Sequence, residues 1–243
     1  MAKLRVDTLL ARKGLAESRE KARVLVMAGA VYLDGERLSR PDKAIDEGSR
    51  LEVRGRPLPY VGFGGVKLER AIKAFGIDVA GKIAIDLGSS TGGFVDFLLQ
   101  AGASRVYAVD AGTHQLHEKL RSDTRVKVLE QVNARYLSPD DIGERADIIT
   151  VDVSFISLKK IIPAALLFLA AGGFLITLVK PQFEVGRYQV GKGGIVKDEE
   201  RIKAVLDDMR AFGAEQGLRA LDVAEAPRER ERKNREYFIL WGR

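Results

Sequence analysis

Strand-like and helical stretches alternate along most of the chain, from residue 66 onward. Apolar runs with the length of strands occur at 82–87, 105–110, 126–130, 146–153, 173–179, 219–225 and 236–241. Helical patterns occupy 66–75 and regions around 92–101, 156–169 and 198–216. This alternation predicts an α/β fold with a mostly parallel seven-stranded sheet and helices on both faces. The last two strands follow each other without a helix, so one of them is expected to run antiparallel.

The first 58 residues are organised differently and predict a small α+β domain. Asp7 is placed to cap one short helix, and Ser18 is placed to cap a second. The segment 31–38, VYLDGERL, has the pattern of two strands around an Asp-Gly turn, and 51–53 supplies another strand. Two short helices packed on a small sheet are therefore expected here.

A stretch without apolar periodicity separates the two patterns. Residues 54–65, RGRPLPYVGFGG, are rich in Gly and Pro, which is typical of a connecting segment. We expect a small domain at 1–58, a linker at 59–65 and a larger domain at 66–243. A chain of 243 residues is long enough for two such cores.

The positive charge of the chain is concentrated in the small domain. The formal net charge is +6 and the calculated pI is about 9.5. Residues 1–58 hold 13 Lys and Arg against 9 Asp and Glu, whereas the rest holds 27 against 25. Arg19 and Arg23 lie four apart on the second expected helix and so share a face. A solvated helix surface can carry such charges, but a local excess also favours a polyanionic partner.

Several classes of site are disfavoured by composition. The chain has no cysteine, which excludes disulfides, thiolate metal sites and a cysteine nucleophile, and fits a reducing, cytoplasmic location. His114 and His117 are the only histidines and lack acidic neighbours with ligand spacing, so no metal is expected. No secretory signal is expected at the start of the chain.

One uncharged run raises the question of a membrane span. Residues 161–179 contain no charged side chain, which meets the length of a spanning helix. Pro163 and the Gly172–Gly173 pair interrupt the run, as expected for a helix, a turn and a strand in an α/β core. We therefore expect no stable membrane association.

The segment 83–94, IAIDLGSSTGGF, is a strand followed by a loop of small residues. The motif from Asp86 to Gly93 is D-x-G-x-S-x-G-G, which differs from the G-x-G-x-x-G motif of dinucleotide-binding folds. The loop also lacks the lysine of a Walker nucleotide-binding loop. An acidic residue ahead of the glycines would repel a pyrophosphate but suits a cofactor with a cationic end. S-adenosylmethionine, with its ammonium and sulfonium groups, is favoured over a nucleotide.

The order of the strands indicates further residues of the expected cofactor site. Asp110 ends the next strand, where an acidic side chain can accept from ribose hydroxyls. Asn133 is placed to bond the adenine amino group, although a turn residue is an equally good interpretation. The full set of expected cofactor-binding residues is Asp86, Gly88, Ser89, Ser90, Gly92, Gly93, Phe94, Asp110, Asn133 and Asp152.

The residues at the end of the fourth strand narrow the choice of methyl acceptor. The sequence there is 151–155, VDVSF, without the paired prolines usual in enzymes that methylate exocyclic amines. Because cysteine is absent, cysteine-dependent methylation of carbon is excluded. A hydroxyl acceptor remains, activated by lysine and carboxylates. The candidate catalytic residues are Asp152 and Lys180 at the ends of the fourth and fifth expected strands, Glu236 at the start of the last, and Lys67 in the expected helix 66–75.

Residues 3–53 resemble a known RNA-binding module. The order of RVDTLL, SREKARVLVMAGAVYLDGERLS and SRLEV is similar to the module named after small-subunit ribosomal protein S-four. The resemblance implies contact with structured RNA through basic side chains that meet phosphates. The RNA-binding residues it implies are Arg5, Arg12, Arg19 and Arg23.

The larger domain resembles the FtsJ-like ribose 2'-O-methyltransferases, which carry a Lys-Asp-Lys-Glu set. The strings GGVKLERAI, DLGSSTGGF, NARYL, DVSFISL, LVKPQFE and NREYF, together with the module, resemble the TlyA family, also labelled hemolysin A. The resemblance implies a Rossmann-like class I methyltransferase fold that uses S-adenosylmethionine. It also implies 2'-O-methylation of cytidine in ribosomal RNA, with ribosomal subunits as partners.

The chemistry implied by the resemblance gives each candidate a role. Lys180 accepts the hydroxyl proton or favours the alkoxide as a cation, while Asp152 and Glu236 position the two lysines. The sequence departs from the family pattern at Thr113 and His114, and 228–238, RERERKNREYF, is unusually basic.

Three alternatives stand beside this interpretation. A pseudouridine synthase shares the N-terminal module, but its catalytic Arg-Leu-Asp context is missing, since 37–43 is a turn. A non-catalytic RNA-binding or assembly factor would not need Lys180 or Asp152. A membrane-active hemolysin would need to insert into lipid.

Overall fold

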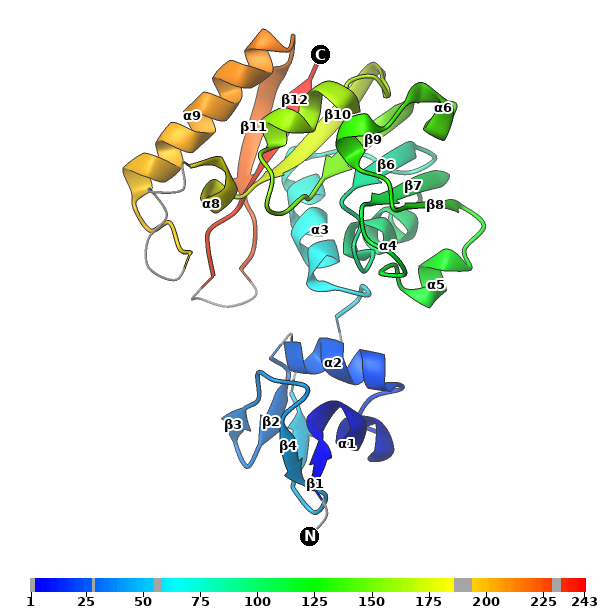
Figure 1. Ribbon diagram of the computed structural model, residues 1–243, viewed down its shortest axis with the longest axis vertical. Helices are drawn as coiled ribbons and strands as arrows, with labels where there is room; N and C mark the ends of the chain where they lie inside the picture. Colours follow the sequence, from blue (N-terminus) through cyan, green and yellow to red (C-terminus); the bar gives the residue numbers. More distant parts are fainter. Residues whose placement is uncertain (1–2, 28, 55–57, 186–193, 229–232) are drawn as a thin grey trace. The chain divides into compact units, whose positions relative to one another are not determined.

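The computed structural model describes residues 3–27, 29–54, 58–185, 194–228 and 233–243 (Figure 1). The chain forms two compact units, Met1–Phe63 and Gly64–Arg243. Each unit has its own cluster of buried apolar side chains.

The first unit is a small α+β domain. Its elements are β1 (Lys3–Arg5), α1 (Val6–Arg12), α2 (Arg19–Met27), β2 (Val31–Leu33), β3 (Glu36–Arg37), β4 (Ala44–Asp46) and β5 (Leu51–Val53). The strands form one sheet in the order β3-β2-β5 and a two-stranded sheet of β1 and β4. The two helices pack on each other and supply much of the core, which includes Leu9, Leu10 and Val26.

The hairpin expected at 31–38 forms around its Asp-Gly turn. Leu33 pairs with Glu36, so only Asp34 and Gly35 lie between the strands. Both have positive φ, 49° and 86°, which is the backbone that a tight two-residue hairpin turn requires. The Ser18 cap also forms, because the Ser18 hydroxyl accepts from the Lys21 N–H at 3.2 Å.

Asp7 does not cap α1, contrary to the sequence prediction. It lies inside the first turn and is completely buried, while Arg5 takes the position before the helix without a side-chain cap. Its carboxylate is instead bonded by Arg5 and contacted by Arg19. Charge pairing explains the difference, because a buried carboxylate next to two guanidiniums pairs with them rather than with the N–H groups of the helix end.

The second unit has an open, twisted sheet of seven strands. The strands are β6 (Ile83–Leu87), β7 (Arg105–Asp110), β8 (Val126–Glu130), β9 (Ala146–Val151), β10 (Leu169–Val179), β11 (Arg219–Glu225) and β12 (Tyr237–Gly242). Their order in the sheet is β11-β12-β10-β9-β6-β7-β8. The strands are parallel except β12, which is antiparallel to both neighbours. The expected fold class and the antiparallel strand are confirmed.

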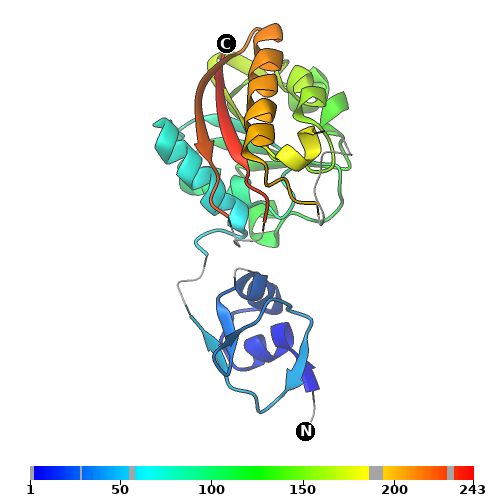
Figure 2. The same cartoon turned by 90° about the vertical axis from the view of Figure 1, so that its left-hand side faces the viewer.

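Helices cover both faces of this sheet. They are α3 (Phe63–Phe75), α4 (Gly93–Gln100), α5 (Glu118–Arg121), α6 (Pro139–Ile142), α7 (Ile162–Ala165), α8 (Pro181–Glu184) and α9 (Glu199–Glu215). Two 3-10 turns, η1 (Ala134–Tyr136) and η2 (Leu158–Lys160), complete the connections. Figure 2 shows α3 and α9 on opposite sides of β11 and β12.

The order of the strands fixes where a ligand can bind. From β6 the chain moves outward through β7 and β8, and then returns to place β9 on the other side of β6. Such a reversal opens a crevice beyond the carboxyl ends of the two central strands. The glycine loop comes after β6 and the candidate Asp152 comes after β9, so both lie at this crevice.

Three expected boundaries are wrong by several residues. The helix expected at 156–169 is only the short η2 and α7, and β10 begins at Leu169, four residues before the expected start. The uninterrupted apolar run gives no polar helical face to mark the change, and Pro163 lies at the start of α7. Gly64 and Gly65, expected in the linker, belong to α3, where helix packing overrides their low helix propensity.

Candidate active site

The ends of β6 and β9 meet at Gly88 and Asp152. Gly88 has a φ of 92°, and a Cβ at this position would lie 2.5 Å from the Asp152 carbonyl oxygen. The Asp152 N–H donates to the Leu87 carbonyl at 2.9 Å, which ties the two strand ends together. A side chain at position 88 would therefore displace Asp152. The glycine is required by this close approach of the chain to itself, whether or not a ligand is bound.

A cavity of about 650 Å³ opens where these strands end, within the range of small-molecule sites. It is lined by Gly88, Ser90, Val109, Asp110, Ala111, Gly112, Gln115, Val132, Asn133, Ala134, Asp152, Val153, Ser154, Phe155, Ile156 and Ile161. Five of the expected cofactor-binding residues are in the lining: Gly88, Ser90, Asp110, Asn133 and Asp152.

The other five expected residues are not in the lining. They are all buried: Asp86, Ser89, Gly92, Gly93 and Phe94. A Cβ on Gly92 would lie 2.2 Å from Leu120 Cδ1, so the glycine permits α5 to pack close. The Phe94 ring lies 6.0 Å from the Phe238 ring, inside the core.

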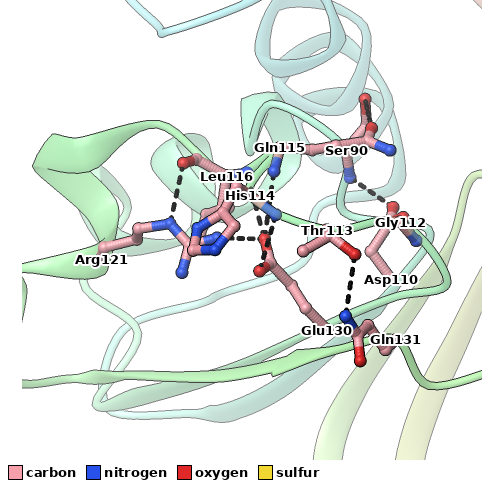
Figure 3. A network of polar contacts seen from close by, with 10 residues as sticks. All are labelled: Ser90, Asp110, Gly112, Thr113, His114, Gln115, Leu116, Arg121, Glu130 and Gln131. Atoms are coloured by element: carbon pink, nitrogen blue, oxygen red, sulfur yellow. Dashed lines mark hydrogen bonds and ion pairs between the residues drawn. The ribbon is translucent and has the colours of Figure 1, made fainter.

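Asp110 holds the loops on either side of it. One carboxylate oxygen accepts from the Ser90 N–H and the other from the Gly112 N–H, both at 2.7 Å (Figure 3). Asp110 thereby joins the glycine loop to the loop after β7. A carboxylate has about four acceptor positions, so both oxygens retain capacity to accept from a ligand hydroxyl.

The loop after β7 is held from below by Glu130, at the end of β8. Its carboxylate accepts from the N–H of His114 at 2.9 Å and of Gln115 at 3.2 Å, and a third contact comes from Leu116 N at 3.5 Å (Figure 3). Arg121 pairs with the same carboxylate. The Arg121 guanidinium, together with the backbone N–H groups, lowers the pKa of Glu130 to about 2.

Glu130 was missed by the sequence interpretation. The signal available was a carboxylate that closes an apolar strand, at the same edge of the sheet as Asp110. In register, Asp110 pairs with Glu130 on the neighbouring strand, so the two acidic residues lie side by side. His114, one of the departures from the family pattern, has a positive φ of 51° in the loop that Glu130 holds.

Asp86 is buried beneath the glycine loop, with 1% of its surface exposed. One of its carboxylate oxygens accepts from the Thr150 hydroxyl at 2.7 Å, and among the described residues Oδ2 has no hydrogen-bond partner. Burial raises the pKa of Asp86 to about 7, and the charges of Asp152 and Asp110 add to the rise. A cationic group above the loop would favour the charged form of this carboxylate.

Asn133 lies in the cavity wall but its carbonyl oxygen is already used. It accepts from the Arg135 N–H at 3.1 Å and so caps η1. An adenine amino group is a donor and would need this same oxygen, because the amide nitrogen of Asn133 can only donate. The oxygen already accepts from the N–H and from Nε of Arg135, so the turn interpretation competes with the binding interpretation.

Lys180 and Asp152 form a pair at the edge of the cavity. Lys180 Nζ lies 2.6 Å from Asp152 Oδ1, outside hydrogen-bond geometry, and donates a hydrogen bond to the Ser154 hydroxyl at 2.9 Å. The lysine side chain is only 10% exposed and the aspartate 22%. Lys180 comes from the end of β10 and Asp152 from the end of the neighbouring β9. Ser154 was not among the expected residues.

Lys67 and Glu236 form a second pair. Lys67 Nζ donates to Glu236 Oε2 at 2.5 Å, although the two residues are 169 positions apart in the chain. In the antiparallel pair of β10 and β12, Val179 lies opposite Tyr237, so Lys180 and Glu236 are the next residues along these two adjacent strands. The structure therefore brings the four expected catalytic residues to one edge of the sheet.

A half-buried carboxylate stabilises the loop that carries Asp152 and Ser154. Glu184, in α8, accepts from the Ser157 hydroxyl at 2.6 Å and from the Leu158 N–H at 2.9 Å. Burial raises the pKa of Glu184 above its ordinary value. In the same loop Phe155 has a positive φ of 65° and is 91% exposed. Its ring lies 5.2 Å from that of Phe183, so two aromatic side chains lie at the cavity rim.

The four arginines expected to contact RNA are all exposed, and two of them share one anchor. Arg5 donates to both oxygens of Asp7, at 3.1 and 2.8 Å, and Arg19 Nε lies 3.4 Å from the same carboxylate. The hydrogen bonds from Arg5 lower the pKa of Asp7 to about 2. Arg12 is paired with Glu47 at 3.3 Å, and Arg23 lies on the exposed face of α2.

Two kinds of feature are missing from the part of the chain that the structure describes. The described residues contain no group of three or more metal-ligating side chains. Nor do they include a helix with the length and apolar character to cross a membrane.

Comparisons with known proteins agree with this architecture. The family model described as FtsJ-like methyltransferase matches residues 60–243, and the S4 domain model matches residues 4–51. The relative named 16S/23S rRNA (cytidine-2'-O)-methyltransferase TlyA, from Mycobacterium tuberculosis strain H37Rv, is 44% identical and covers 98% of this chain and 88% of the relative.

Two other matches are also close to full length. The relative named Hemolysin A, from Brachyspira hyodysenteriae, is 37% identical over 97% of this chain and 98% of its own. A solved structure of a Streptococcus thermophilus protein has 44% identity and a TM-score of 0.78, and covers 99% of this chain and 88% of that one. With both domain models matched in order, the chain belongs to the TlyA family of FtsJ-like methyltransferases.

Proposed function

We propose that this protein transfers a methyl group from S-adenosylmethionine to the 2'-hydroxyl of a cytidine in ribosomal RNA. The observation that carries the proposal is the Lys180–Asp152 pair at the edge of a cavity whose other walls are the glycine loop and Asp110. The family and its near full-length relatives support the substrate class. They favour this interpretation over a pseudouridine synthase.

The residues present fit the cofactor. The cavity has the volume of a small-molecule site, and Asp110 stands where it can accept from ribose hydroxyls. Within the described part of the chain, one buried oxygen of Asp86 has no hydrogen-bond partner, and a cation above the glycine loop would favour the charged form of this carboxylate. Val109, Val132 and Ile161 offer apolar walls for an adenine ring. When bound, S-adenosylmethionine supplies an electrophilic methyl group.

The acceptor hydroxyl is activated by Lys180. In its neutral form the Lys180 amine accepts the proton of the 2'-hydroxyl while the new oxygen–carbon bond forms. The ammonium that results is stabilised by Asp152 at 2.6 Å and by the Ser154 hydroxyl at 2.9 Å. Loss of the methyl group would leave the sulfonium of the cofactor as a neutral thioether, and the hydroxyl proton would be on Lys180, so charge and protons balance.

Lys67 and Glu236 orient the acceptor strand. Their pair is less than one-fifth exposed on each side, and it lies beside Lys180 through the β10–β12 register. Holding donor, acceptor and base in line accounts for a large share of the rate in such transfers. Phe155, with its exposed ring at the rim, is placed to stack on the base of the target nucleotide.

The S4 domain supplies RNA affinity. Arg5, Arg12, Arg19 and Arg23 are exposed and contact phosphates. The buried Asp7 fixes two of the guanidiniums in direction, which reduces the freedom that they lose on binding.

The direct test uses ribosomal subunits purified from cells that lack this protein. Wild-type protein and labelled donor should yield 2'-O-methylcytidine, detected by mass spectrometry of the digested RNA. Lys180→Ala should lower the single-turnover rate by about 10²–10⁴-fold because the proton acceptor is lost. Its affinity for S-adenosylmethionine, measured by calorimetry, should stay within a few-fold of wild type.

Lys160→Ala is the matched control, since Lys160 is an exposed lysine outside the cavity lining. It should keep the wild-type rate. Full methylation by Lys180→Ala would refute the assignment of the base. Cofactor binding absent from the wild-type protein would refute methyl transfer itself and favour the non-catalytic factor.

A further inference from the structure

A second cavity lies in the methyltransferase unit, away from the cofactor-sized one. It has a volume of about 400 Å³ and is bordered by two segments, one before α9 and one before β12. Four of the side chains that line it are cationic: Lys197, Arg228, Lys233 and Arg235. It contains part of the unusually basic segment 228–238, which the catalytic assignments use only at Glu236.

The two segments are joined by one side chain. The Asn234 carbonyl oxygen accepts from the Val196 N–H at 2.8 Å, and its amide nitrogen donates to the Gly194 carbonyl at 2.8 Å. Val196 and Ile202 are buried and form the apolar floor of the cavity. These two hydrogen bonds from the Asn234 side chain hold the segment of Lys197 next to the segment of Lys233 and Arg235.

The described residues that line this cavity include cations but no carboxylate. Two carboxylates contact the arginines from outside the lining. Arg235 pairs with Glu199 at 2.6 Å and approaches Glu225 at 3.9 Å, while Arg228 lies 4.0 Å from Glu225. Among the described residues no carboxylate pairs with Lys197, which is exposed. Cations gathered in one concavity repel each other, and an anionic ligand relieves that repulsion.

One residue that lines this cavity is the sequence neighbour of a candidate catalytic residue. Arg235 immediately precedes Glu236, whose carboxylate holds Lys67 at 2.5 Å. Glu236 lies beside Lys180 through the register of β10 and β12. A phosphate bound at Arg235 would therefore lie near the reacting ribose, so both groups can belong to the same RNA strand.

We infer that this cavity binds the phosphodiester backbone of the RNA strand that carries the target nucleotide. The inference rests on the proposed function, because that function supplies the RNA strand. Guanidinium and ammonium groups around an apolar floor suit a phosphate group, which accepts several charge-assisted hydrogen bonds. A lipid surface would contact a convex, apolar-rich face, whereas these cations line a concavity.

The test measures how RNA affinity depends on salt. A fluorescent single-stranded RNA oligonucleotide is titrated with the full chain by anisotropy at several KCl concentrations. The slope of log K against log salt changes by about 0.7 for each phosphate contact on single-stranded RNA. The pair of substitutions Lys197→Gln and Lys233→Gln should reduce the slope by about 0.7–1.4 and weaken binding at least several-fold in roughly 0.1 M KCl.

Lys203→Gln is the matched control. Lys203 is an exposed lysine on α9, outside the cavity lining, and its loss removes one unit of charge without removing a cavity ligand. It should leave the slope unchanged. Calorimetry with S-adenosylmethionine should give the wild-type affinity for the variant with both cavity substitutions and for the control, which shows that the fold and the cofactor site are intact.

Equal slopes for the cavity variants and the control would overturn the inference. The inference would also be overturned if the cavity variant lost affinity for phosphatidylglycerol vesicles while its RNA affinity stayed unchanged. Absent cofactor binding by the wild-type protein would refute the proposed function, yet the salt slopes would still decide whether the cavity binds RNA.

Discussion

Single residues in this protein often have two structural reasons for their identity. Asp86 was expected to face a cationic cofactor, but its side chain is buried below the loop and bonded by Thr150. Gly88 was expected to admit the cofactor, and it also avoids a clash with the Asp152 carbonyl. Residue type and spacing indicated both positions, whereas only the folded chain reveals that each also supports its neighbour.

The buried Asp86 predicts a pH dependence of stability. Its pKa is about 7 in the folded protein and close to 4 when unfolded, so the unfolded chain releases the proton first as pH rises. Stability should therefore decrease between about pH 4 and pH 7, by at most about 4 kcal/mol from this group. Asp86→Asn, which keeps an acceptor for Thr150, should be more stable than wild type at about pH 8 and similar at about pH 4.5.

Thermal unfolding at the two pH values, without cofactor, measures this effect. Asp147→Asn is the comparison, because Asp147 accepts from the Ile83 N–H at 3.0 Å at the opposite end of the strand. The prediction would be contradicted if the melting temperature of Asp86→Asn fell as much between the two pH values as that of the wild-type protein.

At the scale of elements, the sequence predicts strands better than helices. The ranges 105–110, 126–130 and 219–225 coincide with β7, β8 and β11, because short apolar runs between turn residues have few alternatives. The helix expected at 156–169 fails because its apolar residues are continuous and give no amphipathic face.

Candidate site residues were found where a strand end is visible in the sequence. Asp110, Asp152 and Lys180 each follow or close a strand, and parallel strands bring their carboxyl ends to one edge. The Lys67–Glu236 contact joins a helix near residue 66 to the final strand, and no local pattern encodes it. Ser154, Glu184 and Glu130 were missed because their partners are backbone groups and side chains of other loops.

Glu130 gives a prediction about one element, the loop after β7. Glu130→Gln removes the charge that holds the His114 and Gln115 N–H groups and Arg121, so the loop should lose order. Because Gln115 and Gly112 line the cofactor-sized cavity, the Kd for S-adenosylmethionine should rise about tenfold, or about 1.4 kcal/mol. Isothermal titration calorimetry measures the change.

Glu144→Gln is the matched control for this loop. Glu144 also holds an arginine and a second donor, Arg105 at 2.6 Å and the Tyr107 hydroxyl at 2.5 Å, but it does not line the cavity. It should leave the Kd unchanged while lowering stability. Equal effects of the two substitutions on the Kd would show that Glu130 has no specific role in holding the loop.

At the scale of the whole molecule, two cores predict two unfolding events. The smaller core lies in Met1–Phe63 and the larger in Gly64–Arg243. S-adenosylmethionine should raise only the transition of the larger unit, because a ligand stabilises the unit that binds it.

Asp7→Asn should act on the other transition. Replacing a buried carboxylate that two arginines contact should lower the free energy of unfolding of the small unit by about 1–2 kcal/mol. For a unit of this size, each kcal/mol lowers the melting temperature by roughly 4–8 °C. RNA affinity should fall as Arg5 and Arg19 lose their common anchor, while the Kd for the cofactor stays constant. Differential scanning calorimetry and anisotropy measure the two effects, and a shift of both transitions would contradict the division.

The close junction of Gly88 and Asp152 has a consequence for how this enzyme can diversify. One side of the junction belongs to the glycine loop that lines the cavity, and the other carries the carboxylate next to Lys180. A change in the transfer chemistry would have to rebuild both strand ends at once. The choice of RNA, by contrast, can change through surface loops and arginines that do not touch the junction, so new targets are easier to acquire than new reactions.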